Sequence, residues 1–191
     1  DSQSDRIIEI AAVKVKDGEV VGRFSTFVDP ERNISDEIVR LTGITNSMVA
    51  GAPDQKTAVS SFLDFARGSI LVAHNAAFDT SFIRYACNKF GFEYGFAALD
   101  TLALSRLLYP ELKAHKLDKV CEHLHVLLDG HHRAINDAEA TAGIMLKMFA
   151  ELEKRGITTS EQLNTAAGSI ATGETYHIII FAKNKQGLFN L

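Results

Sequence analysis

Residues 70–73 form a short and wholly apolar run, Ile-Leu-Val-Ala, which lies between two stretches of helical periodicity. A run this short with no polar side is typical of a strand that is buried on both faces and covered by helices. Apolar side chains recur at helical spacing before it, ending at Gly68, and after it, as Phe82, Ile83, Ala86 and Phe90. The chain is therefore predicted to fold as an α/β domain.

Two strands and two short helices are predicted before this run. The Asp17-Gly18 pair predicts a tight turn that joins strands over residues 7–15 and 20–28. Two short helices broken at Gly43 are expected within residues 34–51. The elements predicted after the run are a strand and two helices, over residues 97–99, 102–108 and 117–124.

The clearest helical pattern runs from about Asp137 to Lys154, with apolar residues at regular helical spacing. Asn136 and Glu139 form a capping-box pattern at its start. After Gly156 the chain changes character, because residues 165–175 are rich in Ala, Gly, Ser and Thr. We therefore expect one domain, a linker and the beginning of another domain, over residues 1–156, 157–175 and 176–191.

The composition is that of an ordinary globular protein of 191 residues, with 46% hydrophobic and 23% charged residues and no apolar run long enough for a membrane helix. Cys87 and Cys121 do not form a Cys-x-x-Cys pair, which favours a reducing, cytosolic compartment. The net charge of −4 predicts no broad basic face. A nucleic acid would have to be held locally, and a small-molecule substrate fits the charge equally well.

The segment His74-Asn75-Ala76-Ala77-Phe78-Asp79 follows directly after the predicted buried strand. It therefore lies at the carboxyl end of a strand, where open α/β sheets bind their ligands. This position makes His74 and Asp79 candidate site residues. The alternative is that Asp79 only caps the following helix and that His74 is an ordinary loop histidine.

A second candidate cluster, His132-Arg133-Ala134-Ile135-Asn136-Asp137, leads into the long helix. Asp137 lies where the helix dipole favours an ionised carboxylate, the form that a hard divalent cation binds. His132 lies on the preceding loop, where it can approach the same cation without being a ligand. The alternative is a helix-start aspartate beside a surface pair of histidines.

Taken together, these two clusters resemble the second and third motifs of the DEDDh exonucleases, also called the DnaQ-like family. Asp100-Thr101-Leu102 resembles the segment between those motifs, and Ile7-Ile8-Glu9-Ile10 resembles the second strand of the family. The resemblance covers about residues 5–155. It implies a ribonuclease H-like mixed sheet flanked by helices, and a 3′→5′ exonuclease activity.

Within that family the chain most resembles the proofreading domain of PolC-type bacterial DNA polymerases. In those polymerases the exonuclease is inserted into a PHP domain, and Tyr176–Ile180 resembles the point at which that domain resumes. The resemblance implies three partners, which are a single-stranded or frayed DNA 3′ end, the remainder of the polymerase chain, and the replisome. It also implies a cytoplasmic protein that does not associate with membranes.

Family members carry an Asp-x-Glu pair on a first strand that precedes the segment beginning here at Asp1. Asp1, Asp5 and Glu9 form no such pair, so none of them is expected to replace it. We expect the complete protein to contain that strand. We expect the present chain alone to expose an apolar sheet edge and to have little or no nuclease activity.

The resemblance implies hydrolysis assisted by two Mg²⁺ or Mn²⁺ ions. Asp79 and Asp137 would provide two of four metal-binding carboxylates, and His132 would be the general base that takes a proton from the attacking water. The product would be a nucleoside monophosphate. The residues implied in substrate binding are His74, Asn75 and Phe78.

Three alternatives stay open on the sequence. A free-standing DEDDh exonuclease acting on RNA has the same core motifs, although the residues after Tyr176 argue against it. A non-catalytic nucleic-acid-binding domain of the same fold would explain the absent Asp-x-Glu pair. A zinc site has the right residue types but no common zinc spacing, in Cys121, His123, His125, His131 and His132.

Overall fold

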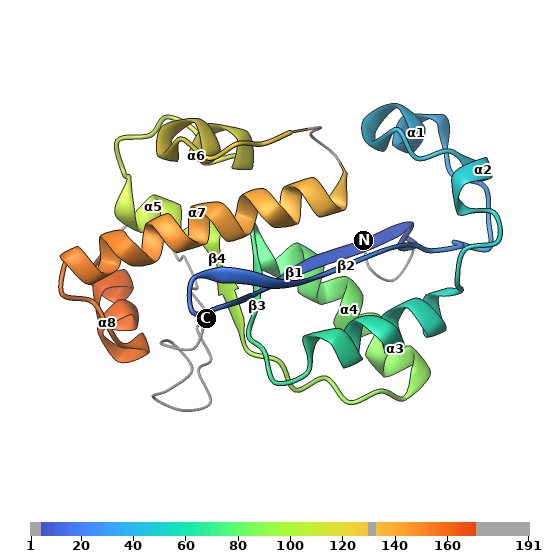
Figure 1. Cartoon of the computed structure of the whole chain (residues 1–191), viewed down its shortest axis with the longest axis horizontal. Helices are drawn as coiled ribbons and strands as arrows, with labels where there is room; N and C mark the ends of the chain where they lie inside the picture. The colour runs from blue at the N-terminus through green and yellow to red at the C-terminus, as the bar shows by residue number, and fades with distance from the viewer. Residues whose placement is uncertain (1–4, 130–132, 171–191) are drawn as a thin grey trace.

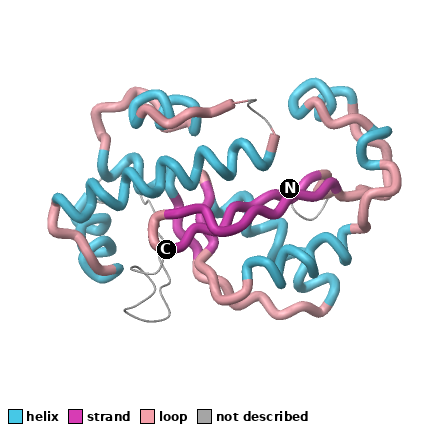
Figure 2. The backbone as a smooth tube through the Cα atoms, in the orientation of Figure 1, coloured by secondary structure: helices cyan, strands magenta, loops and turns pink. Residues whose placement is uncertain are grey.

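The computed structural model describes residues 5–129 and 133–170, and it has helices arranged around two small sheets (Figures 1 and 2). Strands β1 (Glu9–Lys16) and β2 (Glu19–Phe27) pair antiparallel in a hairpin. Asp17 and Gly18 both have positive φ, at 53° and 83°, as a tight hairpin turn requires. The predicted hairpin is therefore confirmed.

The second sheet contains β3 (Leu71–Ala73) and β4 (Ala98–Asp100), which pair in parallel and are connected through α4 (Ala76–Phe90). Their parallel direction puts both carboxyl ends at one edge. The prediction that the first of these strands is buried on both faces was wrong, since all three residues of β3 are only partly buried. Among the described residues β3 pairs with β4 alone, so its other edge is not covered by a strand.

Helices α1 (Asp36–Thr42) and α2 (Asn46–Val49) are separated at Gly43, which has φ 72° and ends α1 in the left-handed conformation. Helix α3 (Gln55–Ala66) begins at Asp54, whose carboxylate accepts a 2.7 Å hydrogen bond from the Thr57 backbone. A hydrophobic core joins the hairpin to α3 and α4. Its buried members include Ile10, Val28, Val59, Phe62, Ile83, Ala86 and Cys87.

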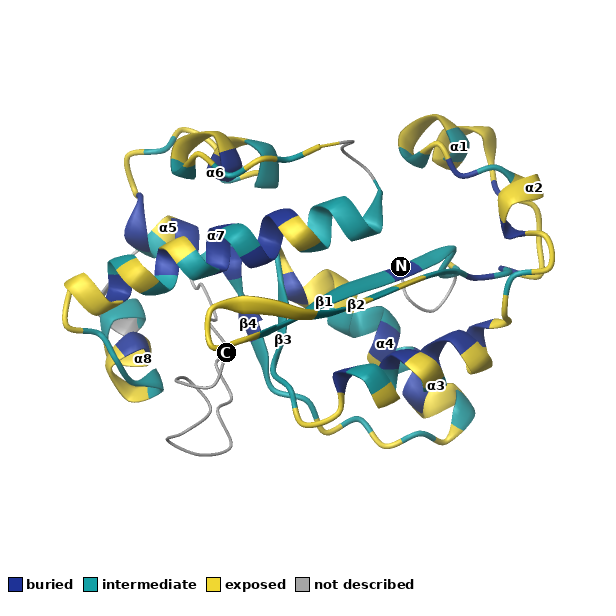
Figure 3. Ribbon diagram, viewed as in Figure 1, coloured by how far each residue is buried: buried dark blue, intermediate teal, exposed yellow. Residues whose placement is uncertain are grey.

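A second core holds the C-terminal helices together, and Figure 3 shows their buried faces turned toward one another. These helices are α5 (Thr101–Leu108), α6 (Leu117–Leu124), α7 (Ala134–Lys154) and α8 (Ser160–Ile170). The largest completely buried side chains between them are Leu104, Val120, Ile144, Met148 and Leu163.

Two sequence-based expectations about these helices need correction. Residues 160–170, expected within a linker, form α8, because Leu163 is completely buried in the second core and holds the helix there. The expected capping box of Asn136 and Glu139 is also wrong. Helix α7 begins earlier, at Ala134, with Arg133 as its N-cap residue. The strand expected near residues 176–182 lies outside the described residues.

The chain after α6 passes very close to α7. A Cβ atom placed on Gly143 of α7 would lie only 2.8 Å from Cγ1 of Val126, so this contact requires glycine. Cys87 and Cys121 are both buried and form no disulfide. Across residues 5–129 and 133–170, every helix is too short or too polar to cross a membrane.

Candidate functional site

Asp79 lies within electrostatic range of two other aspartates, Asp100 and Asp137. Asp79 lies in the first turn of α4, Asp100 ends β4, and Asp137 lies in the first turn of α7. Desolvation raises the pKa of Asp79 to about 6, and the negative charges of Asp100 and Asp137 add to the shift. Asp79 is nevertheless exposed to solvent, so water or a ligand can reach its carboxyl group.

The start of α4 explains why Asp79 remains available at this edge. Asn75, and not Asp79, is the N-cap residue, with a left-handed φ of 73° that asparagine tolerates. The Asn75 backbone N–H donates a 3.0 Å hydrogen bond to the Asp100 carboxylate. The same oxygen of Asp100 accepts a 2.9 Å bond from the Leu102 N–H. The alternative that Asp79 caps α4 is wrong, because Asn75 is the N-cap residue and Asp79 lies inside the helix.

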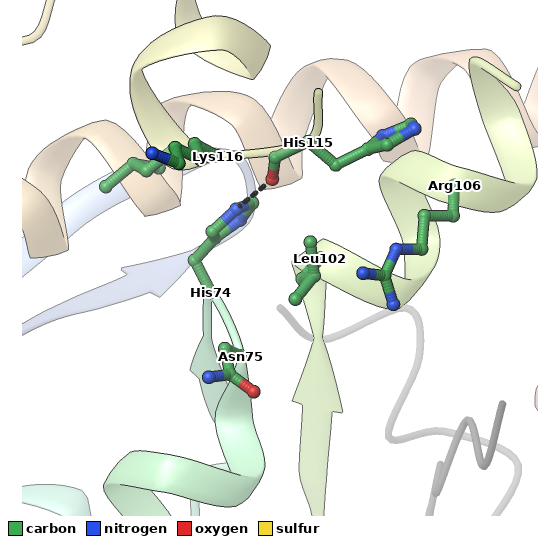
Figure 4. A pocket seen from close by; sticks show the side chains of 7 residues that line it. His74, Asn75, Leu102, Arg106, His115 and Lys116 are labelled. Carbon is green, nitrogen blue, oxygen red and sulfur yellow. Dashed lines mark hydrogen bonds between the residues drawn. The ribbon is translucent and has the colours of Figure 1, made fainter. Parts of the chain in front are cut away.

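His74 is held by hydrogen bonds at both ring nitrogens (Figure 4). Its Nε2 lies 2.7 Å from the carbonyl oxygen of His115, and its Nδ1 lies 3.0 Å from the Thr101 hydroxyl. Burial lowers the pKa of His74, which favours the neutral ring. Because a carbonyl only accepts, Nε2 carries the hydrogen, and Nδ1 accepts from Thr101. Both nitrogens are thus used within the protein to join the ends of β3 and β4 to the loop before α6.

A hollow of about 370 Å³ lies beside this histidine, with a basic rim. Arg106 and Lys116 contribute cationic side chains, and Figure 4 shows Arg106 reaching from α5 toward Leu102. The pKa of His115 is lowered, first by burial and then by the positive charge of Arg106. His115 is oriented by a 3.0 Å contact between its Nδ1 and the Ser105 hydroxyl. The acidic edge of the sheet therefore adjoins a cationic hollow.

Phe78 precedes Asp79 and is one of the few large apolar side chains open to solvent, at 58% exposure. Its ring centroid lies 5.2 Å from that of Phe82, one turn further along α4. An exposed aromatic face beside a cluster of carboxylates is suited to stacking against a flat ligand such as a base.

The start of α7 is held by a residue that the sequence analysis did not select. Glu9 of β1 accepts hydrogen bonds from the Arg133 guanidinium, at 2.9 and 3.3 Å, and from the Ala134 backbone N–H at 3.0 Å. Arg133 also lies over the Phe27 ring, 5.2 Å from its centroid. No local sequence pattern predicts this contact, because Glu9 and Arg133 lie 124 positions apart.

Other predicted site residues are only partly placed. His131 and His132, and with them the predicted general base, lie outside the described residues. Cys121 is buried in the second core, His123 packs against the Tyr109 ring, and His125 ends α6. Within residues 5–129 and 133–170, no three His, Cys, Asp or Glu side chains gather closely enough to hold a metal by themselves.

The donor set nevertheless fits part of a site for a hard divalent cation. Asp79 and Asp137 offer carboxylate oxygens from two different helices, and each lies within the electrostatic field of the other. An Asp79 carboxyl group that is reluctant to ionise becomes an effective ligand once a cation neutralises the surrounding negative charge. The described residues therefore offer two carboxylates of the kind that such a site uses.

Comparison with known proteins agrees with this arrangement. A family model described as exonuclease matches residues 1–145. PolC-type DNA polymerase III of Caldanaerobacter subterraneus subsp. tengcongensis is 45% identical over 98% of this chain, and that of Clostridium perfringens is 44% identical over 100%. The chain spans only 14% and 13% of these relatives.

Solved structures show the same fold. Exonuclease X, in a complex with 5′-overhanging duplex DNA, is 29% identical, with a TM-score of 0.64 over 85% of this chain and 92% of that one. Its agreement confirms the expected ribonuclease H-like α/β class. The chain belongs to the exonuclease family and is homologous to a segment of the PolC-type DNA polymerase III chains.

Proposed function

We propose that this chain is the 3′→5′ proofreading exonuclease domain of a PolC-type replicative DNA polymerase. The observation that carries the proposal is that Asp79 and Asp137, each in the first turn of a different helix, are close enough to interact electrostatically. Such a pair suits a phosphodiesterase that binds divalent cations. The division into residues 1–156, 157–175 and 176–191 remains a prediction of the same proposal, with α8 as a helical part of the middle segment.

The proposed reaction is hydrolysis of the 3′-terminal phosphodiester. Bound Mg²⁺ or Mn²⁺ would supply charge neutralisation at the phosphate and at the leaving oxygen. Asp79 and Asp137 would hold the cations as carboxylates, and the positive charge would favour the ionised form of Asp79. His132 would accept the proton of the attacking water at an imidazole nitrogen while the water oxygen bonds to phosphorus. The bond from phosphorus to the 3′-oxygen of the remaining strand then breaks, that oxygen takes up a proton, and a nucleoside monophosphate is released.

Phe78 and Asn75 are proposed to receive the terminal nucleotide, with Phe78 stacking against its base. His74 is proposed to act mainly by holding this edge in place, because both its ring nitrogens already have protein partners. A mispaired 3′ end frays more readily than a paired one, which would favour its removal. The proposed partners are therefore a single-stranded or frayed DNA end, the remainder of the polymerase chain and the replisome, in the cytoplasm.

The decisive experiment uses the complete protein, including any segment that precedes Asp1, and single-stranded DNA labelled at its 5′ end. We expect Mg²⁺-dependent shortening from the 3′ end and release of mononucleotides, both lost in Asp79→Asn and Asp137→Asn. The Asp64→Asn variant is a matched control, since Asp64 lies on the exposed side of α3. Binding of DNA without cleavage would instead support the non-catalytic alternative, and faster cleavage of RNA would support the RNA exonuclease.

A further inference from the structure

The carboxylate of Glu9 is buried at the junction of β1 and α7. Its side chain is 5% exposed, whereas the Arg133 side chain that pairs with it is 40% exposed. One oxygen of Glu9 accepts from the guanidinium of Arg133, and the other accepts from the Ala134 N–H. Both oxygens are thus used within the protein, which argues against Glu9 as a metal ligand.

The contact with Ala134 takes the place of a missing helix cap. Arg133 is the N-cap residue of α7, and its own side chain makes no capping hydrogen bond. The first N–H groups of a helix have no partner within the helix, and a carboxylate near them is favoured by the helix dipole. Glu9 supplies that carboxylate from a strand on the other side of the interface.

The residue that Glu9 holds also sets the position of Asp137. The carbonyl oxygen of Arg133 accepts hydrogen bonds from the N–H groups of Asn136 and Asp137, at 3.0 and 3.1 Å. The Arg133 guanidinium is held from two sides, by Glu9 and by the ring of Phe27 at the end of β2. A shift of Arg133 would therefore move the turn that carries Asp137.

We propose that Glu9 is a positioning residue for the metal ligand Asp137. Glu9 neither touches the cation nor takes part in the reaction. It holds the first turn of α7 against the hairpin, so that the Asp137 carboxylate is directed toward Asp79 before metal binds. This inference rests on the proposed function, in which Asp137 is a ligand.

The test measures Mn²⁺ affinity of the complete protein, by electron paramagnetic resonance, together with the kinetics of single-stranded DNA cleavage. Glu9→Gln keeps the size of the side chain and removes its charge, and Glu9→Ala removes the contact entirely. Loss of a residue that orients a ligand typically weakens metal affinity by roughly 10-fold to 100-fold. We expect that loss for Glu9→Ala and a smaller one for Glu9→Gln, with kcat rescued by excess Mn²⁺ and KM for DNA unchanged.

A second ion pair between the hairpin and α7 provides the matched control. Arg23 of β2 and Glu139 in the second turn of α7 meet at 2.7 Å, and both side chains are exposed, at 60% and 44%. Glu139→Gln should leave Mn²⁺ affinity unchanged. A merely structural role for Glu9 would lower the unfolding temperature of its variants without changing the Mn²⁺ affinity of the folded protein, and that result would overturn the proposal.

Two further variants keep the outcomes separable. Arg133→Lys retains the positive charge but not the forked geometry of the guanidinium, so it tests the contact between Glu9 and Arg133 if the Glu9 variants do not fold. Unchanged Mn²⁺ affinity in Arg133→Lys would also count against the proposal. Asp137→Asn tests the underlying assignment. If Asp137→Asn loses Mn²⁺ affinity while the Glu9 and Arg133 variants keep it, only the positioning role of Glu9 fails. If Asp137→Asn keeps it as well, the proposed metal site itself fails.

Discussion

The carboxylate of Asp100 accepts a 3.0 Å hydrogen bond from the backbone N–H of Asn75, and this bond joins the end of β4 to the start of α4. The same oxygen caps α5 through the Leu102 N–H. One side chain therefore holds the starts of two helices at the edge where Asp79 lies.

Asp100→Ala should cost about 1–2 kcal/mol of unfolding free energy, because it leaves two helix-start N–H groups without this acceptor. Asp100→Asn keeps a carbonyl acceptor and should cost much less. Urea unfolding of both variants measures the difference. Equal losses would show that charge, and not hydrogen bonding, accounts for the contribution of Asp100.

The stability of the protein should fall in acid partly because of His74. Burial holds the pKa of His74 below its ordinary value, so the unfolded chain binds a proton more readily than the folded one. This contribution is fully present above about pH 6.5 and is lost as pH falls toward the pKa in the folded state. Unfolding free energies at pH 7.5 and 5.5 should therefore differ more for the wild type than for His74→Gln.

Asp79 should have the opposite dependence in metal-free protein. Its pKa is raised to about 6, so the folded state binds the proton more readily than the unfolded chain. Stability should then decline as pH rises from about 4 to about 6. Asp79→Asn should remove this decline and be more stable than wild type at pH 7 in the presence of a chelator. A variant less stable than wild type under those conditions would contradict the expected cost of ionising Asp79 in the folded protein.

Gly143→Ala should destabilise the protein, although alanine is normally favoured over glycine within a helix by about 1 kcal/mol. The added methyl group would lie 2.8 Å from Val126, and such overpacking typically costs about 1–3 kcal/mol. Val126→Ala should relieve the clash in the double variant. A thermodynamic cycle over the four proteins measures this coupling, and additive effects would argue against the contact.

Features controlled by neighbouring residues were predictable from the sequence. The Asp17-Gly18 turn set the hairpin, and apolar spacing located the helix over Asp137 to Lys154 to within a few residues. Helix α8 was missed because its Ala, Ser and Thr content resembles that of a linker, whereas Leu163 buries its side chain in the second core and stabilises the helix there. Composition alone cannot report that burial.

The residues of the candidate site also differ in whether the sequence predicts them. The sequence predicts Asp79 and Asp137 as candidates because each lies at the start of a predicted helix. In the structure the charge of Asp137 contributes to the raised pKa of Asp79. The roles of Asp100 and Glu9 could not be predicted, because their partners depend on how distant elements pack. Glu9 had been excluded as a metal ligand on sequence grounds, and its contact with Arg133 gives a physical reason for that exclusion.

The two ion pairs that connect the hairpin to α7 should respond differently to ionic strength. Salt screens the exposed pair of Arg23 and Glu139, whereas the buried oxygens of Glu9 are largely protected from counterions. Concentrated salt would therefore weaken the contact between the middle of β2 and the second turn of α7, and would leave the contact of Glu9 with the first turn of α7 in place. The start of α7, and with it the turn that carries Asp137, should therefore keep its position over a wider range of salt concentration than the contact between Arg23 and Glu139 does.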